Sequence, residues 1–190
     1  YRPKDFNEII GQDAIVKTLS NAIDYQKIPQ ALLFCGPRGV GKTSCARILA
    51  KKINDLDENF EYNIFELDAA SNNSVDDIRN LIEQVRYPPQ SGKFKVYIID
   101  EVHMLSNAAF NAFLKSLEEP PPHVVFILAT TEKNKIIPTI LSRCQIYDFK
   151  KVDNNSIIGL LSKICKEKKI KFDDNSLEII AEKSDGSIRD

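Results

Sequence analysis

Residues 36–43, with the sequence GPRGVGKT, restrict the fold of this chain more than any other stretch. They fit the pattern G-x-x-x-x-G-K-[ST] and lie between a short apolar run, residues 31–35, and a segment with helical character. Because glycine has no side chain, the backbone of such a loop can wrap around phosphate groups at the positive end of a helix dipole. A glycine-rich turn could match by chance, but the flanking strand and helix favour a phosphate-binding loop.

Each residue of this loop is a candidate ligand of a nucleotide. We expect Lys42 to reach the β and γ phosphates and the Thr43 hydroxyl to hold Mg²⁺. The residues expected around the nucleotide are Gly36, Pro37, Arg38, Gly39, Val40, Gly41, Lys42, Thr43 and Ser44.

Strand-like runs alternate with helical patterns along most of the chain. The predicted strands are residues 31–35, 63–68, 94–100, 124–129 and 145–149, and at least two are apolar throughout, as in parallel strands covered on both faces. The predicted helices include residues 13–27, residues 74–86 with a capping box of Ser74 and Asp77, and a helix that starts after Ser106 and stops at the prolines of EPPPH. This alternation predicts an α/β fold with a doubly wound parallel sheet.

The pattern changes after residue 150, where only helices are predicted, at about residues 155–168 and 175–184. We therefore expect an α/β domain in residues 1–150 and the start of a helical domain in residues 151–190. The chain has 190 residues, does not begin with methionine and stops abruptly at GSIRD, so we interpret it as part of a longer protein.

Composition excludes several classes of protein. The longest apolar run, VVFILA, is too short to cross a bilayer, and the N-terminus has no apolar signal core, so we expect a cytoplasmic protein without membrane contact. The 26 basic and 27 acidic residues give a net charge of −1, which argues against a uniformly basic, nucleic-acid-coating surface but leaves local phosphate contacts open.

The four cysteines are scattered, and none forms a C-x-x-C pair: Cys35, Cys45, Cys144 and Cys165. We expect free thiols in a reducing compartment and no zinc site among these residues.

Two carboxylates end the apolar run KVYIIDE, at the strand end where ligands bind in such sheets. We expect Asp100 to support Mg²⁺ and Glu101 to orient or deprotonate the attacking water. Adjacent acids at a strand end are often only solvated, but a preceding phosphate-binding loop favours chemistry.

Polar residues near the next strand ends have two interpretations each. His103 completes DEVH, which is similar to helicase boxes, although a structural or supporting role is favoured. Thr131, with Thr130 second, is expected to sense the γ phosphate, the alternative being two ordinary β-branched strand residues.

Several stretches occur in a fixed order: YRPKDFNEIIGQ, GPRGVGKTS, ELDAASNNSVDDIR, KVYIIDEVHMLS, NAFLKSLEEPP, ILATTEKNKIIPTILSRC and DGSIRD. Together they closely resemble the ATPase region of bacterial DNA polymerase III subunits gamma and tau, the AAA+ ATPases of the clamp loader. The phosphate-binding loop is shared by many nucleotide hydrolases, whereas DEVHMLS, LEEPP and SRC in series are far more specific. The resemblance covers nearly the whole chain and implies a P-loop AAA+ domain followed by a truncated helical lid, with the collar beyond residue 190.

The resemblance also implies roles for single residues. Arg143 of SRC would be an arginine finger directed at ATP on a neighbouring subunit, and the nearest acidic residue in the flanking sequence is Asp148, so we expect it to lack a partner in its own chain. Arg189 would be a second sensor that reaches from the lid to its own nucleotide. Arg2, Pro3 and Ile10 would line the adenine pocket, unless this segment is only a leader packed on the core.

Contacts with DNA are implied less specifically. Lys115 either helps couple DNA binding to the neighbouring site or is a solvated helix lysine. DNA would be held through its phosphates by helix N-termini, with residues 71–74 (SNNS) as candidates; the alternative for these residues is a plain helix cap.

The implied function is that of an ATPase motor that uses ATP and Mg²⁺ to open the sliding clamp and load it onto primed DNA. Its partners would be gamma or tau copies, delta, delta-prime, the clamp and primer–template DNA, and without the collar this region would be largely monomeric. The alternatives are another AAA+ DNA-remodelling ATPase, such as a branch-migration motor, and a nucleotide-binding scaffold with negligible turnover. The sequence does not distinguish gamma from tau.

One departure from the family concerns metal binding. Many gamma and tau subunits carry a four-cysteine zinc module where this chain has residues 54–63, NDLDENFEYN, without cysteine. We therefore expect no structural zinc. The complete GPRGVGKT argues against delta-prime, which typically lacks a working P-loop.

Overall fold

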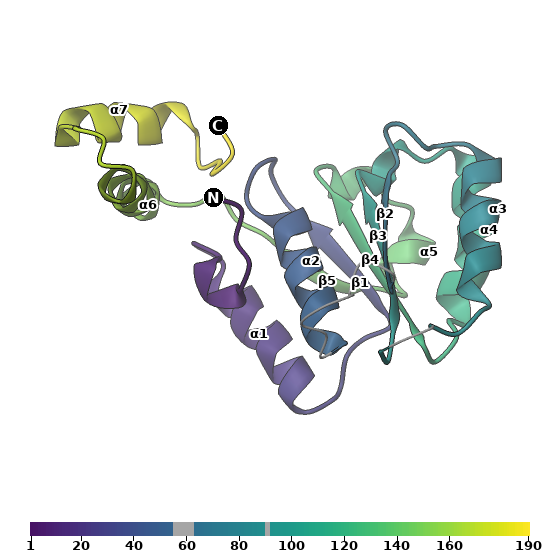
Figure 1. The fold of residues 1–190 in the computed structure, drawn as a ribbon. Coiled ribbons are helices and arrows are strands. Elements are labelled where there is room, and N and C mark those ends of the chain that lie inside the picture. Colours follow the sequence, from purple (N-terminus) through teal and green to yellow (C-terminus); the bar gives the residue numbers. More distant parts are fainter. Residues whose placement is uncertain (55–62, 90–91) are drawn as a thin grey trace.

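A sheet of five parallel strands forms the centre of the molecule, in the order β2-β3-β4-β1-β5 (Figure 1). The computed structural model describes residues 1–54, 63–89 and 92–190. The strands are β1 (Ala31–Cys35), β2 (Ile64–Asp68), β3 (Lys95–Asp100), β4 (Val124–Thr130) and β5 (Gln145–Asp148). The predicted α/β fold with a parallel sheet is confirmed, and each strand end lies within one residue of the expected position.

Helices cover both faces of the sheet (Figure 1). On one face lie α1 (Asp13–Asp24) and α2 (Lys42–Ile53); on the other lie α3 (Val75–Val85), α4 (Asn107–Glu118) and the short α5 (Pro138–Leu141). Side chains of β1 alternate between two cores: Leu32 and Phe34 pack under α1 and α2, and Leu33 packs under α3 and α4. Because both faces are buried, the central strands are apolar along their length.

The helix starts follow from local chemistry. Ser74 accepts a hydrogen bond from the backbone N–H of Asp77, and the Asp77 carboxylate bonds back to the Ser74 backbone, so the predicted capping box of α3 is confirmed. Ser106 caps α4 in the same way through the N–H of Ala109, and α4 ends at Glu118, ahead of the prolines. Short 3₁₀ turns also occur: η1 (Phe6–Glu8), η3 (Val102–Met104) and η4 (Lys133–Lys135).

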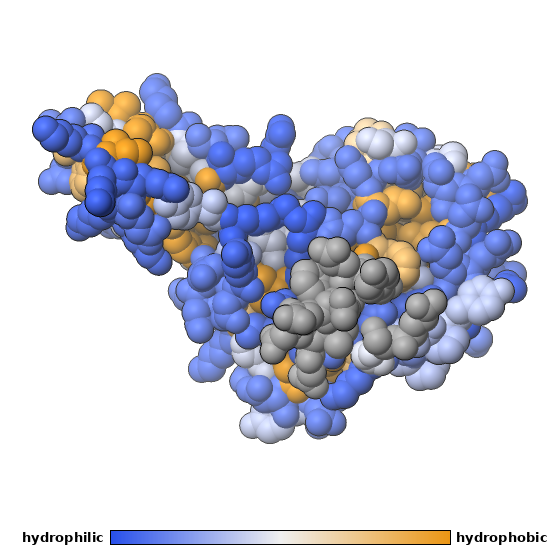
Figure 2. Space-filling model, in the orientation of Figure 1, coloured by the Kyte–Doolittle hydropathy of each residue, from blue (hydrophilic) through white to orange (hydrophobic). Residues whose placement is uncertain are grey.

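The C-terminal helices α6 (Asn154–Glu167) and α7 (Asp174–Lys183) lie outside these layers, near the N-terminus (Figure 1). They share a small core of Val152, Ile157 and Ala181, against which Ile10 packs. Both predicted helices are present, each displaced by one residue toward the N-terminus. Figure 2 shows a largely hydrophilic face with apolar side chains visible over α7, where Ile179 and Ile180 are exposed.

Three further features of the described residues bear on the sequence expectations. None of their helices is long and apolar enough to cross a membrane. The four cysteines are free, as predicted, and burial raises the pKa of the Cys45 thiol to about 12. The described residues contain no cluster of three potential metal ligands. The zinc expectation concerned residues 54–63, of which 55–62 lie outside the described part.

Candidate nucleotide-binding site

The glycine-rich loop joins β1 to α2 at the carboxyl edge of the sheet. Gly36 and Gly39 have φ values of 142° and 74°, a region that side-chain-bearing residues rarely adopt. A Cβ atom on Gly36 would lie 2.4 Å from the Phe149 carbonyl oxygen, and one on Gly39 would lie 2.0 Å from Ser187 Oγ. Both positions therefore need glycine for the close approach of other chain segments as well as for backbone geometry.

Lys42 is enclosed by this loop. Its side chain is 6% exposed, and Nζ donates hydrogen bonds to the carbonyl oxygens of Gly36 at 2.7 Å and Pro37 at 2.6 Å. Burial lowers the pKa of Lys42, and the nearby carboxylates of Glu101 and Asp100 oppose that shift. The ammonium group thus lies inside the loop with negative charge close by.

Thr43 and Asp100 bring two oxygen atoms together. The Thr43 hydroxyl donates to Asp100 Oδ2 at 2.6 Å, and the other carboxylate oxygen accepts from the backbone N–H of Glu101 at 3.0 Å. A hydroxyl and a carboxylate side by side match the oxygen ligands that Mg²⁺ takes in phosphate sites. The chemistry and proximity of this pair fit the predicted ion.

Glu101 is held by the residue that follows the neighbouring strand. Thr131 donates to Glu101 Oε2 from its hydroxyl at 3.0 Å and from its backbone N–H at 3.3 Å. Thr130 is fully buried, and its hydroxyl lies 3.0 Å from His103 Nδ1. Of the two threonines, Thr131 lines the cavity and Thr130 supports its wall.

A cavity of about 980 Å³ unites most of the predicted residues. Its lining includes Arg2, Pro3, Ile10, Arg38, Gly39, Val40, Gly41, Lys42, Thr43, Ser44, Asp100, Glu101, Thr131 and Arg189. Gly36 and Pro37 lie behind it, where their carbonyl groups bind Lys42. Sequence reasoning did not assign Tyr1, Glu8, Ile9, Asp68, Ala70, Met104, Leu160 and Ile188 to this site, although they also line it.

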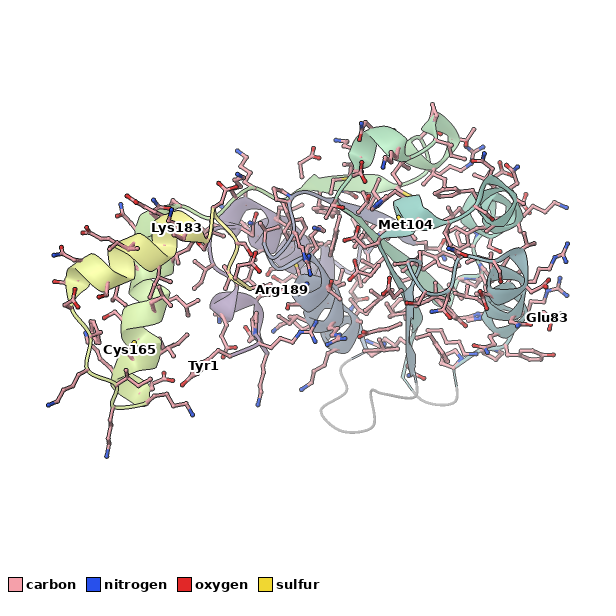
Figure 3. All side chains as sticks on the ribbon, turned by 90° about the horizontal axis from the view of Figure 1, so that it is seen from above. Tyr1, Glu83, Met104, Cys165, Lys183 and Arg189 are labelled. Atoms are coloured by element: carbon pink, nitrogen blue, oxygen red, sulfur yellow. The ribbon has the colours of Figure 1, made fainter. Side chains whose placement is uncertain are left out.

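Residues from both ends of the chain line the cavity. Arg2 Nε donates to Ser44 Oγ at 3.4 Å, which brings the N-terminal segment onto the start of α2. The C-terminal segment is tied to the loop by a hydrogen bond of 3.0 Å from the Ile188 N–H to the Gly39 carbonyl oxygen. Figure 3 shows the adjacent Arg189 beside α2.

Arg143 does not join this site, and one expectation about it was wrong. It has an acidic partner in its own chain: Nη2 lies 2.7 Å from Glu118 Oε1 at the end of α4, and Nη1 donates to the Thr139 carbonyl oxygen at 2.7 Å. Glu118 is distant in sequence, and folding brings it close by packing α5 against the C-terminal end of α4. The pair is partly exposed to solvent.

The candidate DNA contacts are not among the described residues that line the cavity. Lys115 is exposed on α4. Ser74 serves as the cap of α3, so its hydroxyl already has a structural task, while Ser71 and Asn73 precede the helix.

Comparisons with known proteins agree with this geometry. The family described as DNA polymerase III, delta subunit, matches residues 11–153. Over the whole chain, the tau subunits of Bacillus subtilis and Escherichia coli are 48% and 42% identical, and the chain spans 37% and 32% of their lengths. The gamma subunit of Buchnera aphidicola (strain Bp) is 42% identical, with 56% of its length spanned.

A solved structure shows the same fold. The RuvB Holliday junction branch migration motor of Thermotoga maritima superposes with a TM-score of 0.77 at 24% identity, covering 99% of this chain and 61% of that protein. The likeness confirms the predicted α/β fold and, at this identity, carries nothing further. The family match and the curated relatives together show that the chain belongs to the DNA polymerase III, delta subunit family, and they confirm its resemblance to the gamma and tau subunits.

Proposed function

We propose that this chain is the ATPase region of a motor subunit of the bacterial replicative clamp loader, which uses ATP to open a sliding clamp and place it on primed DNA. The observation that carries the proposal is the convergence of Lys42, the Thr43–Asp100 pair and Glu101 on one cavity behind a glycine-rich loop. The similarity to gamma and tau subunits supports the clamp loader rather than another AAA+ machine.

The loop and the lysine would bind the phosphates. Backbone N–H groups of residues 38–41 and the start of α2 supply donors and a favourable dipole, and Lys42 supplies a positive charge. Thr43 and Asp100 would hold Mg²⁺, which when bound neutralises charge on the β and γ phosphates. The apolar side chains of Pro3 and Ile10, with Arg2, would face the adenine.

Glu101 would act on water. As the water oxygen bonds to the γ phosphorus, its proton passes to the Glu101 carboxylate, and the bond from phosphorus to the leaving ADP oxygen breaks. Thr131, which holds that carboxylate, would sense the γ phosphate. Arg189 would respond to the nucleotide from the C-terminal side, so the lid angle would differ between ATP and ADP.

Arg143 would act on the cavity of a neighbouring chain. Strand β5 begins at Gln145, in register with Leu32 near the start of β1, whereas the phosphate-binding loop follows the other end of β1 at Cys35. Arg143 therefore lies toward the opposite edge of the sheet from its own cavity and is not among the described residues that line it. An exposed ion pair such as that with Glu118 contributes about 0–1 kcal/mol, so releasing Arg143 to a phosphate costs little.

The partners proposed are further gamma or tau copies, delta, delta-prime, the sliding clamp and primer–template DNA, in the cytoplasm. ATP bound in each cavity and gripped by Arg143 of a neighbour would draw the subunits into a spiral that holds an open clamp. Hydrolysis would then loosen the interface.

The first test is ATP turnover by the full-length protein assembled with its delta-type partners. We expect clamp plus primer–template DNA to stimulate turnover and Arg143→Ala to lower the stimulated rate by roughly 10³-fold or more, as for other arginine fingers. Arg79→Ala, which removes an exposed arginine of α3 paired with Asp76, is the matched control and should leave the rate unchanged. Stimulation by a four-way junction instead would indicate a branch-migration motor, and indifference to clamp and DNA would contradict the proposal.

A further inference from the structure

His103 lies buried between two carboxylates at the cavity wall, and the proposed chemistry gives it no task. Its side chain is 6% exposed. Nδ1 lies 3.0 Å from Thr130 Oγ1 and 3.3 Å from Glu101 Oε2, while Nε2 lies 3.3 Å from Glu132 Oε1. Because each ring nitrogen has a polar neighbour, turning the ring would leave buried polar atoms unpaired, and its orientation is therefore fixed.

The backbone at Glu101 is what brings the imidazole back beside the carboxylate. Glu101 has φ 47° and ψ 43°, a left-handed conformation that is unfavourable for a residue with a side chain. The chain then enters η3, which closes with a hydrogen bond of 2.8 Å from the Met104 N–H to the Glu101 carbonyl oxygen. Glu101 and His103 are consequently parts of one strained turn.

The far side of the ring is tied to the loop after β4. Lys135 donates to Glu132 Oε1 at 2.8 Å, and this hydrogen bond lowers the pKa of the Glu132 carboxyl group. His103 Nε2 lies 3.3 Å from the same oxygen, so the Glu132 carboxylate contacts both Lys135 and the imidazole. The Thr130 hydroxyl is fixed in turn because it accepts from the Glu132 N–H at 3.0 Å.

Within the described part of the chain, the contacts of the Glu101 carboxylate group converge on one oxygen, Oε2. Among the described residues, Oε2 is approached by the Thr131 hydroxyl, the Thr131 N–H and His103 Nδ1, at 3.0, 3.3 and 3.3 Å. This leaves Oε1 as the oxygen available to a water molecule. Because Oε2 is hydrogen-bonded to Thr131 and packed against the imidazole, the direction of the other carboxylate oxygen is defined.

We infer that His103 is a positioning residue for Glu101: it holds the carboxylate against Thr131 and ties it, through Glu132, to the loop that follows β4. The inference rests on the proposed role of Glu101 as the residue that activates water. Misplacing a catalytic group by about 1 Å can cost on the order of 10²-fold in rate, which is the scale of effect that loss of the imidazole would have.

The experiment measures steady-state ATP turnover and nucleotide affinity in the full-length protein assembled with its partners. We expect His103→Ala to lower kcat by roughly 10- to 100-fold with unchanged affinity for a fluorescent ATP analogue. In a Glu101→Gln background the same substitution should cause no further loss, because no catalytic carboxylate is left to position. His123→Ala is the control, since the other histidine binds the Val85 carbonyl oxygen at 3.1 Å, away from the cavity.

The conservative variants separate positioning from folding. His103→Asn keeps a polar atom near the place of Nδ1, and His103→Gln keeps one near Nε2, so Asn should restore more of kcat. Three outcomes would each overturn the inference. The first is that His103→Ala lowers kcat equally with and without Glu101→Gln. The others are that nucleotide affinity falls together with kcat, or that His103→Asn and His103→Gln have equal rates. If clamp and DNA do not change ATP turnover, the clamp-loading proposal is contradicted, and the His103 variants are still compared by their basal rates. If the complex shows no ATP turnover at all, both proposals are rejected.

Discussion

Lys42 is bonded to carbonyl oxygens of its own loop, so a nucleotide has to compete with two contacts that already exist. The exchange is favourable because phosphate oxygens carry full negative charge and carbonyl oxygens do not. The short Thr43–Asp100 hydrogen bond presents a similar exchange to a metal ion. At the scale of single residues, a bound nucleotide and metal ion would therefore replace hydrogen bonds that the protein already makes within itself.

Substituting Lys42 tests that exchange. We expect Lys42→Ala to weaken ATP binding by roughly 10- to 100-fold, since hydrogen bonds to charged groups contribute about 1.5–3 kcal/mol. The measurement is a titration with a fluorescent ATP analogue, with Lys17→Ala on the exposed side of α1 as the control. Equal affinity of Lys42→Ala and the unchanged protein for the ATP analogue would argue against contact between Lys42 and phosphate. If Lys42→Ala abolished ATP binding but clamp loading continued, the protein would be a nucleotide-binding scaffold.

The sequence predicted those residues of the candidate site that lie at the ends of neighbouring strands. Asp100 ends a strand, Glu101 and Thr131 each follow one, and a parallel sheet gathers such positions at one edge. It could not find the Glu118–Arg143 pair, because that contact depends on where the end of α4 meets α5. Leu160 and Ile188 were likewise beyond reach, since their place in the cavity depends on how the C-terminal segments lie against the sheet.

At the scale of elements, helices α3 and α4 begin side by side. The backbone N–H of Ser106, the cap of α4, donates to the Asn73 carbonyl oxygen, next to the cap of α3, at 3.5 Å. Two adjacent helix N-termini with positive dipole ends favour an anion, and residues 71–74, the segment proposed to contact DNA phosphates, lie there. The Ser74 hydroxyl, however, both accepts from the Asp77 N–H and donates to its carboxylate.

Removing the cap separates the two roles open to this segment. We expect Ser74→Ala to lower the free energy of unfolding by about 1 kcal/mol, as for other N-caps, while the affinity of the complex for primer–template DNA stays unchanged. Ser71→Ala, an exposed serine outside the capping box, should leave stability unaltered. Chemical denaturation and DNA titration measure the two quantities. Weakened DNA binding without loss of stability would show that Ser74 contacts DNA instead.

At the scale of the whole molecule, the cavity lies between the sheet and the C-terminal segment. Ser187 and Ile188 rest against Gly39, and Leu160 of α6 adds an apolar wall. A change in how α6 and α7 sit would therefore alter the shape of the cavity directly. Under the proposed function, the nucleotide state would affect the position of the C-terminal helices through these contacts.

Two glycines of the loop allow a matched test of this docking. Gly39 and Gly41 both have positive φ, but a Cβ would meet Ser187 Oγ only at Gly39, whereas nothing lies within 4 Å of it at Gly41. We expect Gly39→Ala to release the segment and speed hydrogen exchange at the Ile188 amide by roughly fivefold or more, in line with the loss of one hydrogen bond. Gly41→Ala should not, and Ser187→Gly should partly restore protection in the Gly39→Ala chain. Equal exchange in the two alanine variants would contradict the docking.

The cavity and Arg143 lie toward opposite edges of the sheet, so the two sides of the molecule present different groups to neighbouring chains. Under the proposed function, each chain offers its arginine on one side and receives one on the other. A row of such chains then always contains one completed site fewer than it has chains, because the cavity at one end meets no arginine. A closed ring contains as many completed sites as chains. The number of ATP molecules hydrolysed in a single turnover, divided by the number of chains, would therefore report whether the assembly is an open row or a ring.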